Sequence, residues 1–305
     1  DSLVEHEMKR NSRARQKFGT GPVSIVDPSS QINELRLRKS DGEIAIMRHS
    51  AKIASQAHIQ AMANTKPGVG EWQLEGIIEG VFKYCRTSGI AYPCIIGSGD
   101  NATVLHYTVN DDTCEEGEVL LIDAGCEYNG YASDITRSWP VNGKFSEAQT
   151  EIYQIVLKSQ IAAIDECRVG NSYDAPHIAA RRVLAEGLIE LGVIKQDLDE
   201  ALSADGELNT WYMHNTGHWL GLDVHDVGIY RPDGEARLLE EGMVLTVEPG
   251  LYFGAWRPDV DCPERYANIG IRIEDDVLVT KDGPDVLSSD CPKTIANIES
   301  IVGTA

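Results

Sequence analysis

The chain has 305 residues, and 42% of them are hydrophobic, which is enough for a large buried core. Lys and Arg number 27 against 48 Asp and Glu, giving a formal net charge of −21 that would repel nucleic-acid phosphates and anionic lipid. No apolar run approaches the ~18 residues that a membrane span needs. We therefore expect a globular protein with no nucleic-acid partner and no membrane contact.

The seven cysteines are odd in number, scattered, and never form a CxxC pair. This pattern indicates neither a disulfide framework nor a thiolate zinc site, and it favours a reducing compartment. We expect the cytoplasm, with the mitochondrial matrix as the alternative. The sequence starts at Asp1 and not at Met, so we expect that an upstream piece has been removed.

Residues 1–39 are polar, with a basic cluster and turn-forming residues but no sustained hydrophobic period. We interpret them as a linker or the remnant of an N-terminal domain, followed by one folded domain over residues 40–305. At its start, Ser40 and Glu43 form a capping box, and apolar residues then recur at helical spacing until Pro67.

A second helix, with Leu74 to Cys85 on its apolar face, is expected to end near Gly89. The same arrangement recurs 103 residues later, where a helix capped by Ser146 precedes another that ends at Gly192. We interpret this recurrence as two related halves, although chance similarity within an α/β chain is the alternative. Each half is expected to continue into a glycine-flanked strand containing a histidine, Leu105-His106-Tyr107 and Gly217-His218-Trp219.

A strong hairpin signal lies between these helix pairs. Asn129-Gly130 is typical of a two-residue turn and would pair Tyr128 with Tyr131. The same register places Asp134 opposite Gly125. Because side chains alternate along a strand, Asp134 and Asp123 then share one face, roughly 7–8 Å apart at the backbone. Two acids on an apolar strand are costly unless positive charge lies between them.

Three later segments supply similar groups. His218 is flanked by glycines that allow a close backbone approach. Glu248 follows the apolar run Val244–Val247, and Glu274 follows Ile271-Arg272-Ile273, where alternation places Arg272 and Glu274 on one face.

Together these groups are four carboxylates and one imidazole: Asp123, Asp134, His218, Glu248 and Glu274. Bridging carboxylates can hold two divalent ions about 3.5–4 Å apart, and two such ions would balance four negative charges. Oxygen-dominated ligation favours Mn²⁺, with Co²⁺, Zn²⁺ or Fe²⁺ as substitutes. Taken singly, each residue has an ordinary structural explanation, and spacing alone does not bring five distant segments together.

Four motifs carry a resemblance to aminopeptidase P, the Xaa-Pro aminopeptidases among the pita-bread metallopeptidases, of bacterial or mitochondrial type. They are Asp123-Ala-Gly-Cys-Glu-Tyr through Asp134-Ile-Thr-Arg, Gly217-His218-Trp-Leu-Gly-Leu-Asp-Val-His225-Asp-Val-Gly, Thr246-Val-Glu248-Pro-Gly, and Gly270-Ile-Arg272-Ile-Glu274-Asp-Asp. The resemblance extends from about residue 31 to the C-terminus. It implies an α+β pita-bread fold over residues 40–305, with two pseudo-symmetric halves around a curved antiparallel sheet, and two metal ions at the five positions above.

The resemblance also implies roles for further residues. His106 and His214 would contact the substrate carbonyl or the tetrahedral intermediate, and His225 would help to bind the scissile region. Glu248 would also act as acid and base, and Arg272 would orient the metal-binding carboxylates. A metal-bridging hydroxide would attack the peptide carbonyl, and Glu248 would pass a proton to the leaving proline nitrogen.

The sequence therefore predicts a dinuclear Xaa-Pro aminopeptidase acting on peptides with proline second, with a homo-oligomer possible. Prolidase, which splits Xaa-Pro dipeptides, is the nearest alternative on the same fold. Methionine aminopeptidase is disfavoured by Trp219 and Leu220 after the ligand histidine. A non-catalytic peptide-binding module is the alternative of another class, and the complete set of ligand types argues against it. Aminopeptidases of the family carry a large N-terminal domain, of which about forty residues would remain here.

Overall fold

The computed structural model describes residues 2–19 and 26–305. The chain divides into two compact units, Asp1–Leu35 and Arg36–Ala305. The first contains α1 (Ser2–Phe18) and most of α2 (Ser29–Leu37). These two helices were not predicted from the sequence, because their residues are mostly polar. In α1, local ion pairs such as Lys9 with Glu5 join side chains one turn apart.

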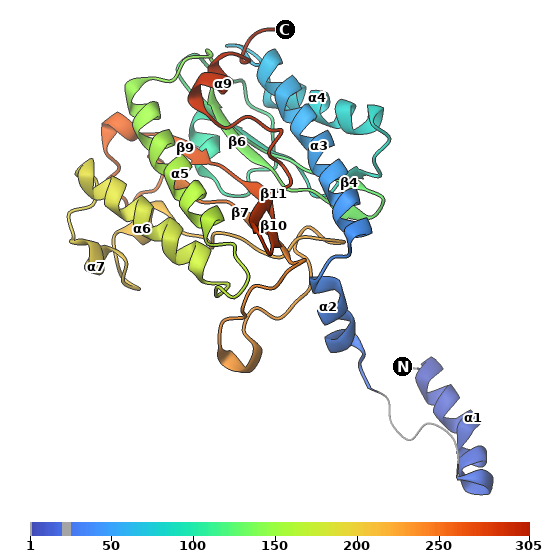
Figure 1. The fold of residues 1–305 in the computed structure, drawn as a ribbon. Coiled ribbons are helices and arrows are strands. Elements are labelled where there is room, and N and C mark those ends of the chain that lie inside the picture. Colours follow the sequence, from blue (N-terminus) through green and yellow to red (C-terminus); the bar gives the residue numbers. More distant parts are fainter. Residues whose placement is uncertain (1, 20–25) are drawn as a thin grey trace. The chain divides into compact units, whose positions relative to one another are not determined.

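The second unit begins its helical part with α3 (Asp41–Asn64) and α4 (Glu71–Tyr84), as the hydrophobic periods predicted. The backbone N–H and the hydroxyl of Ser40 both donate to the Glu43 carboxylate, 2.7 and 2.6 Å away, so the expected capping box is present. The two helices pack against each other (Figure 1), and their apolar faces enter the main core with Phe82 and Ile78.

Short strands follow α4, all paired antiparallel. Their order is β1 (Gly89–Ile90), β2 (Ile95–Ser98), the 3₁₀ turn η1 (Gly99–Thr103), β3 (Val119–Asp123), β4 (Cys126–Tyr128), β5 (Tyr131–Ala132) and β6 (Thr136–Pro140). Tyr128 pairs with Tyr131, and Asp123 pairs with Thr136, so the predicted hairpin register is maintained past Gly125. A side chain at Gly125 would meet the Ser133 carbonyl oxygen at 1.7 Å, which explains the glycine.

A second helix pair follows, as predicted. Ser146 caps α5 (Glu147–Asp165) by accepting from the Gln149 backbone N–H at 3.2 Å, and α6 (Ala175–Glu190) ends just before Gly192. The short helices α7 (Leu198–Ala201) and α8 (Leu208–Trp211) lead to the turn η2 (Pro232–Gly234). The antiparallel strands that follow are β7 (Val244–Val247), β8 (Gly250–Tyr252), β9 (Gly270–Arg272), β10 (Asp275–Thr280) and β11 (Gly283–Val286), with η3 (Glu264–Tyr266) before β9 and α9 (Ile295–Glu299) at the end.

The two predicted histidine-containing strands are wrong. Residues 104–109 follow η1 as irregular chain, with Val104 and Val109 exposed, and pair with no strand of the described part of the chain. Around His218, Trp219 forms a bridge to Leu245 of β7, and backbone bonds also join His218 and Leu220 to that strand, but the segment forms a single bridge and not a strand. Pattern alone did not distinguish such loops from strands.

The second unit is an α+β structure, as predicted. Figure 1 shows the strands lying between the α3–α4 and α5–α6 pairs. Trp139, Tyr153 and Ile122 lie in the main hydrophobic core, to which both helices and strands contribute. All seven cysteines are free, and no helix of the described part of the chain has both the length and the apolar character to cross a lipid bilayer.

Candidate metal centre

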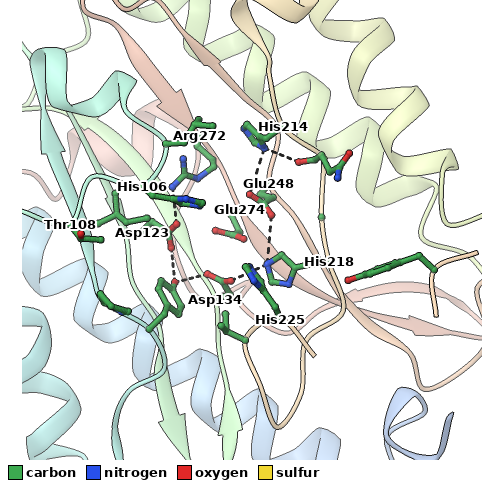
Figure 2. A pocket seen from close by; sticks show the side chains of 18 residues that line it. His106, Thr108, Asp123, Asp134, His214, His218, His225, Glu248, Arg272 and Glu274 are labelled. Atoms are coloured by element: carbon green, nitrogen blue, oxygen red, sulfur yellow. Dashed lines mark hydrogen bonds and ion pairs between the residues drawn. The ribbon is translucent and has the colours of Figure 1, made fainter. Parts of the chain in front are cut away.

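A cavity of about 600 Å³ opens where the ends of several strands meet. The segments that converge there are the end of β3, the loop between β5 and β6, the chain around residue 218, and the ends of β7 and β9. Its lining contains every predicted site residue: His106, Asp123, Asp134, His214, His218, His225, Glu248, Arg272 and Glu274. Figure 2 shows these side chains pointing toward one another. The prediction that five distant segments converge is thereby supported.

Asp123 and Asp134 lie on one face of the hairpin, as the register requires, and a tyrosine connects them. The Tyr92 hydroxyl lies 2.6 Å from Asp123 Oδ1 and 2.5 Å from Asp134 Oδ1. The hydroxyl has one hydrogen to donate, so the second short contact requires a proton from one of the two carboxyls, and Tyr92 holds their near oxygens together. The outer oxygen of Asp123 accepts from Arg272 Nη2 at 2.7 Å.

Asp134, His218 and Glu274 lie close together, because one ligand atom from each lies within 4.8 Å of the others. His218 Nε2 is 3.4 Å from Asp134 Oδ2 and 3.7 Å from Glu248 Oε1. The backbone explains this placement: Thr246 Oγ1 accepts from the His218 N–H at 3.1 Å, which ties the histidine loop to β7. Glu248 follows that strand directly.

Arg272 and Glu274 share a face, as alternation predicted, while Ile271 and Ile273 enter the core. Thr136 connects the two functional groups, since its hydroxyl donates to Glu274 Oε2 at 2.6 Å and accepts from Arg272 Nε at 3.0 Å. Arg272 is the only cationic side chain of Lys or Arg type that lines the described cavity. The centre therefore holds more negative than positive charge.

Burial and the excess of negative charge raise the pKa values of several carboxylic acids at the centre. Burial first, and then neighbouring carboxylates, raise the pKa of Asp134 and hold that of Glu274 well above its ordinary value. Burial also raises the pKa of Glu248 to about 7, and Asp276, which accepts from the Asp134 backbone N–H at 3.2 Å, is shifted far upward as well. Burial and like charge therefore make it costly for all of these acids to be ionised together unless a cation neutralises them.

His218 shows where that cation belongs. Burial alone would lower its pKa, but the hydrogen bond and the charge of Asp134 outweigh burial and raise the pKa to about 9. Its Nδ1 lies 3.0 Å from the Trp219 carbonyl oxygen, so Nδ1 is the donor and Nε2 faces the acids. A proton on Nε2 therefore occupies the position that a metal ion would take.

A chain of hydrogen bonds links Arg272 to His214. Arg272 Nη1 donates to the Tyr252 hydroxyl at 3.0 Å, and that hydroxyl lies 2.8 Å from His214 Nε2. His214 Nδ1 is 2.7 Å from the Asn215 carbonyl oxygen and 3.9 Å from Glu248 Oε2. A carbonyl can only accept, so Nδ1 carries the hydrogen and Nε2 accepts from Tyr252. Burial, and then the charge of Arg272, lower the pKa of His214 to about 3, so the ring is neutral.

His106 and His225 line the same cavity without hydrogen bonds to other described residues. The His225 ring lies edge-on to His218, with centroids 4.3 Å apart. Burial, followed by His218 and His106, lowers the pKa of His225. Both rings are therefore available to a ligand in the cavity.

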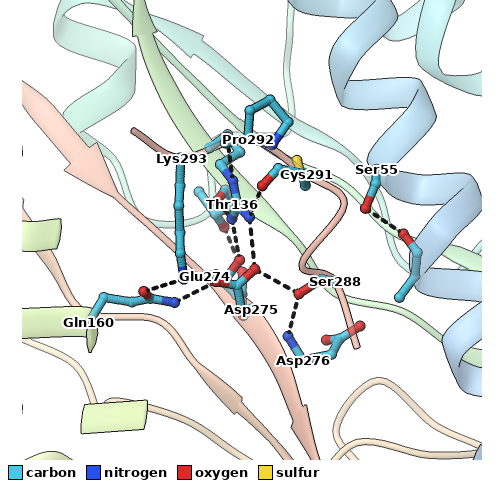
Figure 3. A network of polar contacts seen from close by, with 12 residues as sticks. Ser55, Thr136, Gln160, Glu274, Asp275, Asp276, Ser288, Cys291, Pro292 and Lys293 are labelled. Atoms are coloured by element: carbon cyan, nitrogen blue, oxygen red, sulfur yellow. Dashed lines mark hydrogen bonds and ion pairs between the residues drawn. The ribbon is translucent and has the colours of Figure 1, made fainter. Parts of the chain in front are cut away.

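A buried network supports the centre from behind (Figure 3). Arg137 is fully buried and donates to the Glu274 carbonyl at 2.6 Å, to Asp275 Oδ1 at 2.7 Å and to the Cys291 carbonyl at 2.9 Å. Lys293 Nζ lies 2.6 Å from the other Asp275 oxygen. Arg137 thus clamps β6, β10 and the C-terminal segment together and fixes the backbone that carries Glu274.

The donor set fits divalent cations. Four carboxylates and one imidazole are hard and borderline ligands, and the raised pKa values of Asp134 and Glu274 indicate that neighbouring side chains do not compensate the negative charge. No thiol lines the described cavity. Such a set suits oxygen-preferring divalent ions and not a closed structural zinc.

Sequence reasoning missed several supporting residues. Tyr92, Thr136 and Tyr252 hold the site residues through their hydroxyls, and nothing in their spacing marks them. Asp275 and Asp276, which could have been an exposed acidic edge, are both buried. The only available signal was their position next to Glu274 after an apolar run.

The fold and the centre define a metallopeptidase, and comparison with known proteins agrees. The model of metallopeptidase family M24 matches residues 45–281, so the chain belongs to that family. Membership implies divalent metal ions. The expected pita-bread fold is confirmed by aminopeptidase PepP of Pseudomonas aeruginosa, whose structure matches with a TM-score of 0.93 and 42% identity over 98% of this chain and 67% of the other.

Within the family the predicted resemblance to aminopeptidase P is also confirmed. The Xaa-Pro aminopeptidase of Escherichia coli (strain K12) is 43% identical over 305 residues, covering this whole chain and 68% of the relative. The structure of E. coli aminopeptidase P with the inhibitor Pro-Leu matches with a TM-score of 0.91 and 44% identity, over 99% of this chain and 67% of the other. The Xaa-Pro dipeptidase of Mus musculus is 38% identical over 91% of this chain and 62% of its own length. The chain thus spans about two thirds of these relatives.

Proposed function

We propose that this chain is the catalytic part of a Xaa-Pro aminopeptidase, which hydrolyses the bond between an N-terminal residue and a following proline. The observation that carries the proposal is the convergence of Asp134, His218 and Glu274 within 4.8 Å, with Asp123 and Glu248 in the same cavity. The identity of 43% to a Xaa-Pro aminopeptidase supports the substrate class.

We propose two metal ions, with Mn²⁺ favoured by the oxygen-rich donor set. Asp123, Asp134, His218, Glu248 and Glu274 would hold them, and Arg272 and Thr136 would orient the carboxylates. When bound, such ions polarise a carbonyl and make water a stronger acid. Every other contribution comes from side chains of this chain.

Glu248 is the acid and base of the proposed mechanism. Its carboxyl lines the cavity beside His218, 3.7 Å from Nε2, where it can exchange a proton with a bound substrate. It would accept the proton of the attacking water and pass it to the proline nitrogen, which carries no hydrogen of its own in the peptide.

The histidines bind the substrate in this proposal. His106 and His225 have no hydrogen bonds to other described residues, so their ring N–H groups can donate to the substrate carbonyl and the scissile region. His214 differs because both of its nitrogens are engaged. It can reach the developing oxyanion only by exchanging its bond to the Asn215 carbonyl or to Tyr252.

A cleavage assay tests the function. The chelator-treated protein is incubated with a tripeptide Xaa-Pro-Xaa, with and without Mn²⁺, and with Xaa-Ala-Xaa as control. We expect Mn²⁺-dependent release of the first residue from the proline peptide alone. Absence of hydrolysis at every metal concentration, with metal bound, would favour a non-catalytic peptide-binding module.

Prolidase activity is the second candidate, because a Xaa-Pro dipeptidase is also related. The same assay with an Xaa-Pro dipeptide separates the two: a prolidase cuts only the dipeptide, whereas an aminopeptidase cuts the longer peptide. We further propose that residues 40–305 form the catalytic domain and that residues 1–39 are a linker or the remnant of an N-terminal domain. The proposed location is a reducing compartment, the cytoplasm or alternatively the mitochondrial matrix. Assembly into a homo-oligomer stays a prediction.

A further inference from the structure

A second group of metal-ligating side chains lies outside the centre. Glu75 and Glu79 stand one turn apart on α4, and Cys94 lies in the segment that leads into β2. One ligand atom of each lies within 4.8 Å of the others. None of the three lines the cavity described above.

The Cys94 thiol has no partner outside its own residue. The side chain belongs to a residue that is 1% exposed, and its Sγ is near only its own backbone N–H and makes no hydrogen bond to another described residue, whereas Cys126 and Cys167 each donate to the backbone carbonyl of another residue. Burial, and then Glu75 and Glu79, raise the pKa of Cys94 to about 12. A buried, unbonded thiol thus faces two carboxylates whose field would stabilise a cation beside it.

The two carboxylates also lack compensation by positive side chains. Asn110 Nδ2 donates to Glu75 Oε1 at 3.0 Å, which fixes that carboxylate and leaves its second oxygen available. Glu79 is exposed and makes no hydrogen bond or ion pair within residues 2–19 and 26–305. Neither glutamate pairs with a lysine or arginine of that described part. Glu79 therefore opens the group to solvent on one side.

We propose that Glu75, Glu79 and Cys94 form a separate site for a single thiophilic divalent cation of the zinc class, with water as the fourth ligand. The Cys94 thiol releases its proton to solvent as the metal–sulfur bond forms. Zinc accepts cysteine sulfur and carboxylate oxygen together, and its bond lengths place tetrahedral ligand atoms roughly 3.3–3.8 Å apart. The exposed Glu79 side chain closes the remaining distance by a change of rotamer. A CxxC search misses this site because its ligands come from a helix turn and a distant loop.

The site is adjacent to the centre along the chain. Cys94 follows Tyr92 and Pro93, which line the cavity, and Tyr92 holds Asp123 and Asp134 together. A cation bound to Cys94 would tie this segment to α4. The ligand chemistry nevertheless separates the two sites, because the centre offers oxygen and nitrogen and this one offers sulfur.

Cobalt titration of the chelator-treated full chain tests the proposal. A Co²⁺–thiolate bond produces a charge-transfer band in the near ultraviolet, which a site made of carboxylates and imidazole does not. We expect a band that follows the binding isotherm of one Co²⁺ site per chain, in addition to the Co²⁺ that the centre takes up, and that Zn²⁺ displaces. It should vanish in Cys94→Ser and persist in Cys85→Ser, the matched control at the partly exposed end of α4.

Glu79→Gln provides a variant at an exposed position that will not disturb folding. We expect it to weaken the affinity that the band reports by about tenfold or more, as loss of an outer ligand partner already does in known sites. Asp134→Asn, in the centre, should leave the band unchanged, so this test is independent of the proposed peptidase function. No band in the wild type, a band that survives Cys94→Ser, or an unchanged affinity in Glu79→Gln would overturn the proposal.

Discussion

At the residue scale, Glu274 has a carboxylate that suits a bound cation but destabilises the folded protein when no cation is bound. The carboxyl is buried near Asp134, and its raised pKa shows that ionising it in the fold costs free energy. Glu274→Gln keeps the shape and removes the charge, so the metal-free variant should unfold at a temperature higher than wild type by roughly 2–4 °C, about 1 kcal/mol. Differential scanning calorimetry after chelation measures this.

Addition of Mn²⁺ should reverse that order. The wild type gains stability from the bound ions, about 2.7 kcal/mol at a hundredfold excess over the dissociation constant, and Glu274→Gln gains less. Glu235→Gln, which removes an exposed carboxylate far from any partner, is the control and should change neither state. A chelated Glu274→Gln protein that melts below the wild type would contradict the surplus of negative charge.

Proton release on metal binding is a second expectation for these residues. At pH 7 the metal-free centre carries a proton on His218, whose pKa is about 9, and a partial proton on Glu248, whose pKa is about 7. Metal binding must displace both, so affinity should fall as the pH decreases from 8 to 6, by about tenfold per unit for each proton displaced. Calorimetric titration in buffers of different ionisation enthalpy counts the protons, and a count of zero would contradict this assignment.

The sequence could predict part of the centre. Asp123 and Asp134 follow from the Asn129-Gly130 turn, because hairpin register is set locally and extends along the strands. Tyr92 could not be predicted in the same way. Its contact with both acids depends on how β2 packs on β3, and no local pattern encodes that packing.

At the element scale, the attachment of the His218 loop to β7 depends on a close backbone approach. A Cβ at Gly217 would lie 1.9 Å from the Thr246 carbonyl oxygen, so Gly217→Ala must push the loop away from the strand. A displacement near 1 Å at the centre should reduce kcat/KM by about 10²-fold. Metal affinity should fall with it, measured by titration.

Gly76→Ala is the matched control for that experiment. Gly76 lies inside α4, and a Cβ there meets no atom within 4 Å. Alanine is the better helix former, so this variant should gain about 0.5–1 kcal/mol of stability and keep full activity. Equal effects of the two substitutions would show that loop position does not matter.

The ion pairs of Asp275 with Arg137 and Lys293 should make the stability of the protein depend on pH. Asp275 is buried, but the charges of Arg137 and Lys293 outweigh burial and lower its pKa to about 2. Because the pKa of Asp275 is lower in the folded than in the unfolded protein, its charge increases the free energy of unfolding at pH values above the unfolded pKa near 3.8. This contribution is lost as the pH falls toward about 2. Asp275→Asn should cost about 3–5 kcal/mol at pH 7, because Arg137 stays buried without its charge partner.

The difference between wild type and Asp275→Asn should then narrow in acid. About 1 kcal/mol of it should be lost by pH 3, which urea unfolding across the pH range can measure. Asp282→Asn, at an exposed turn after β10, should show no such convergence. A constant difference from pH 7 to pH 3 would mean that the Asp275 charge does not support the clamp.

Element prediction succeeded where one helix face is apolar and capped. Ser40 and Ser146 both start helices at the expected residues, because capping and periodicity are local properties. It failed at α1 and α2, whose residues are mostly polar, and at residues 104–109, which pair with no strand of the described part of the chain. Around His218 it failed because the backbone bonds to β7 amount to a single bridge and not to a strand. Pairing partners far along the chain decide such cases.

At the scale of the whole molecule, the start of the folded domain remains to be tested. The sequence predicts a start at Ser40, whereas compactness divides the chain before Arg36. The residues between have clear partners: Leu37 is buried, and the Asp226 side chain, itself 1% exposed, pairs with Lys39 at 3.1 Å and with Arg36. Asp226 directly follows His225, so this pairing reaches the cavity.

Two truncated chains should therefore differ. A chain beginning at Arg36 should match the full chain in stability and in metal affinity. A chain beginning at Ser40 leaves Asp226 buried without either cation and should lose about 3–5 kcal/mol, measured by urea unfolding. Asp226→Asn in the shorter chain removes the unpaired charge and should restore part of the loss, because a neutral amide is less costly to bury. If both truncated chains are equally stable, residues 36–39 belong to the linker and the boundary lies at Ser40.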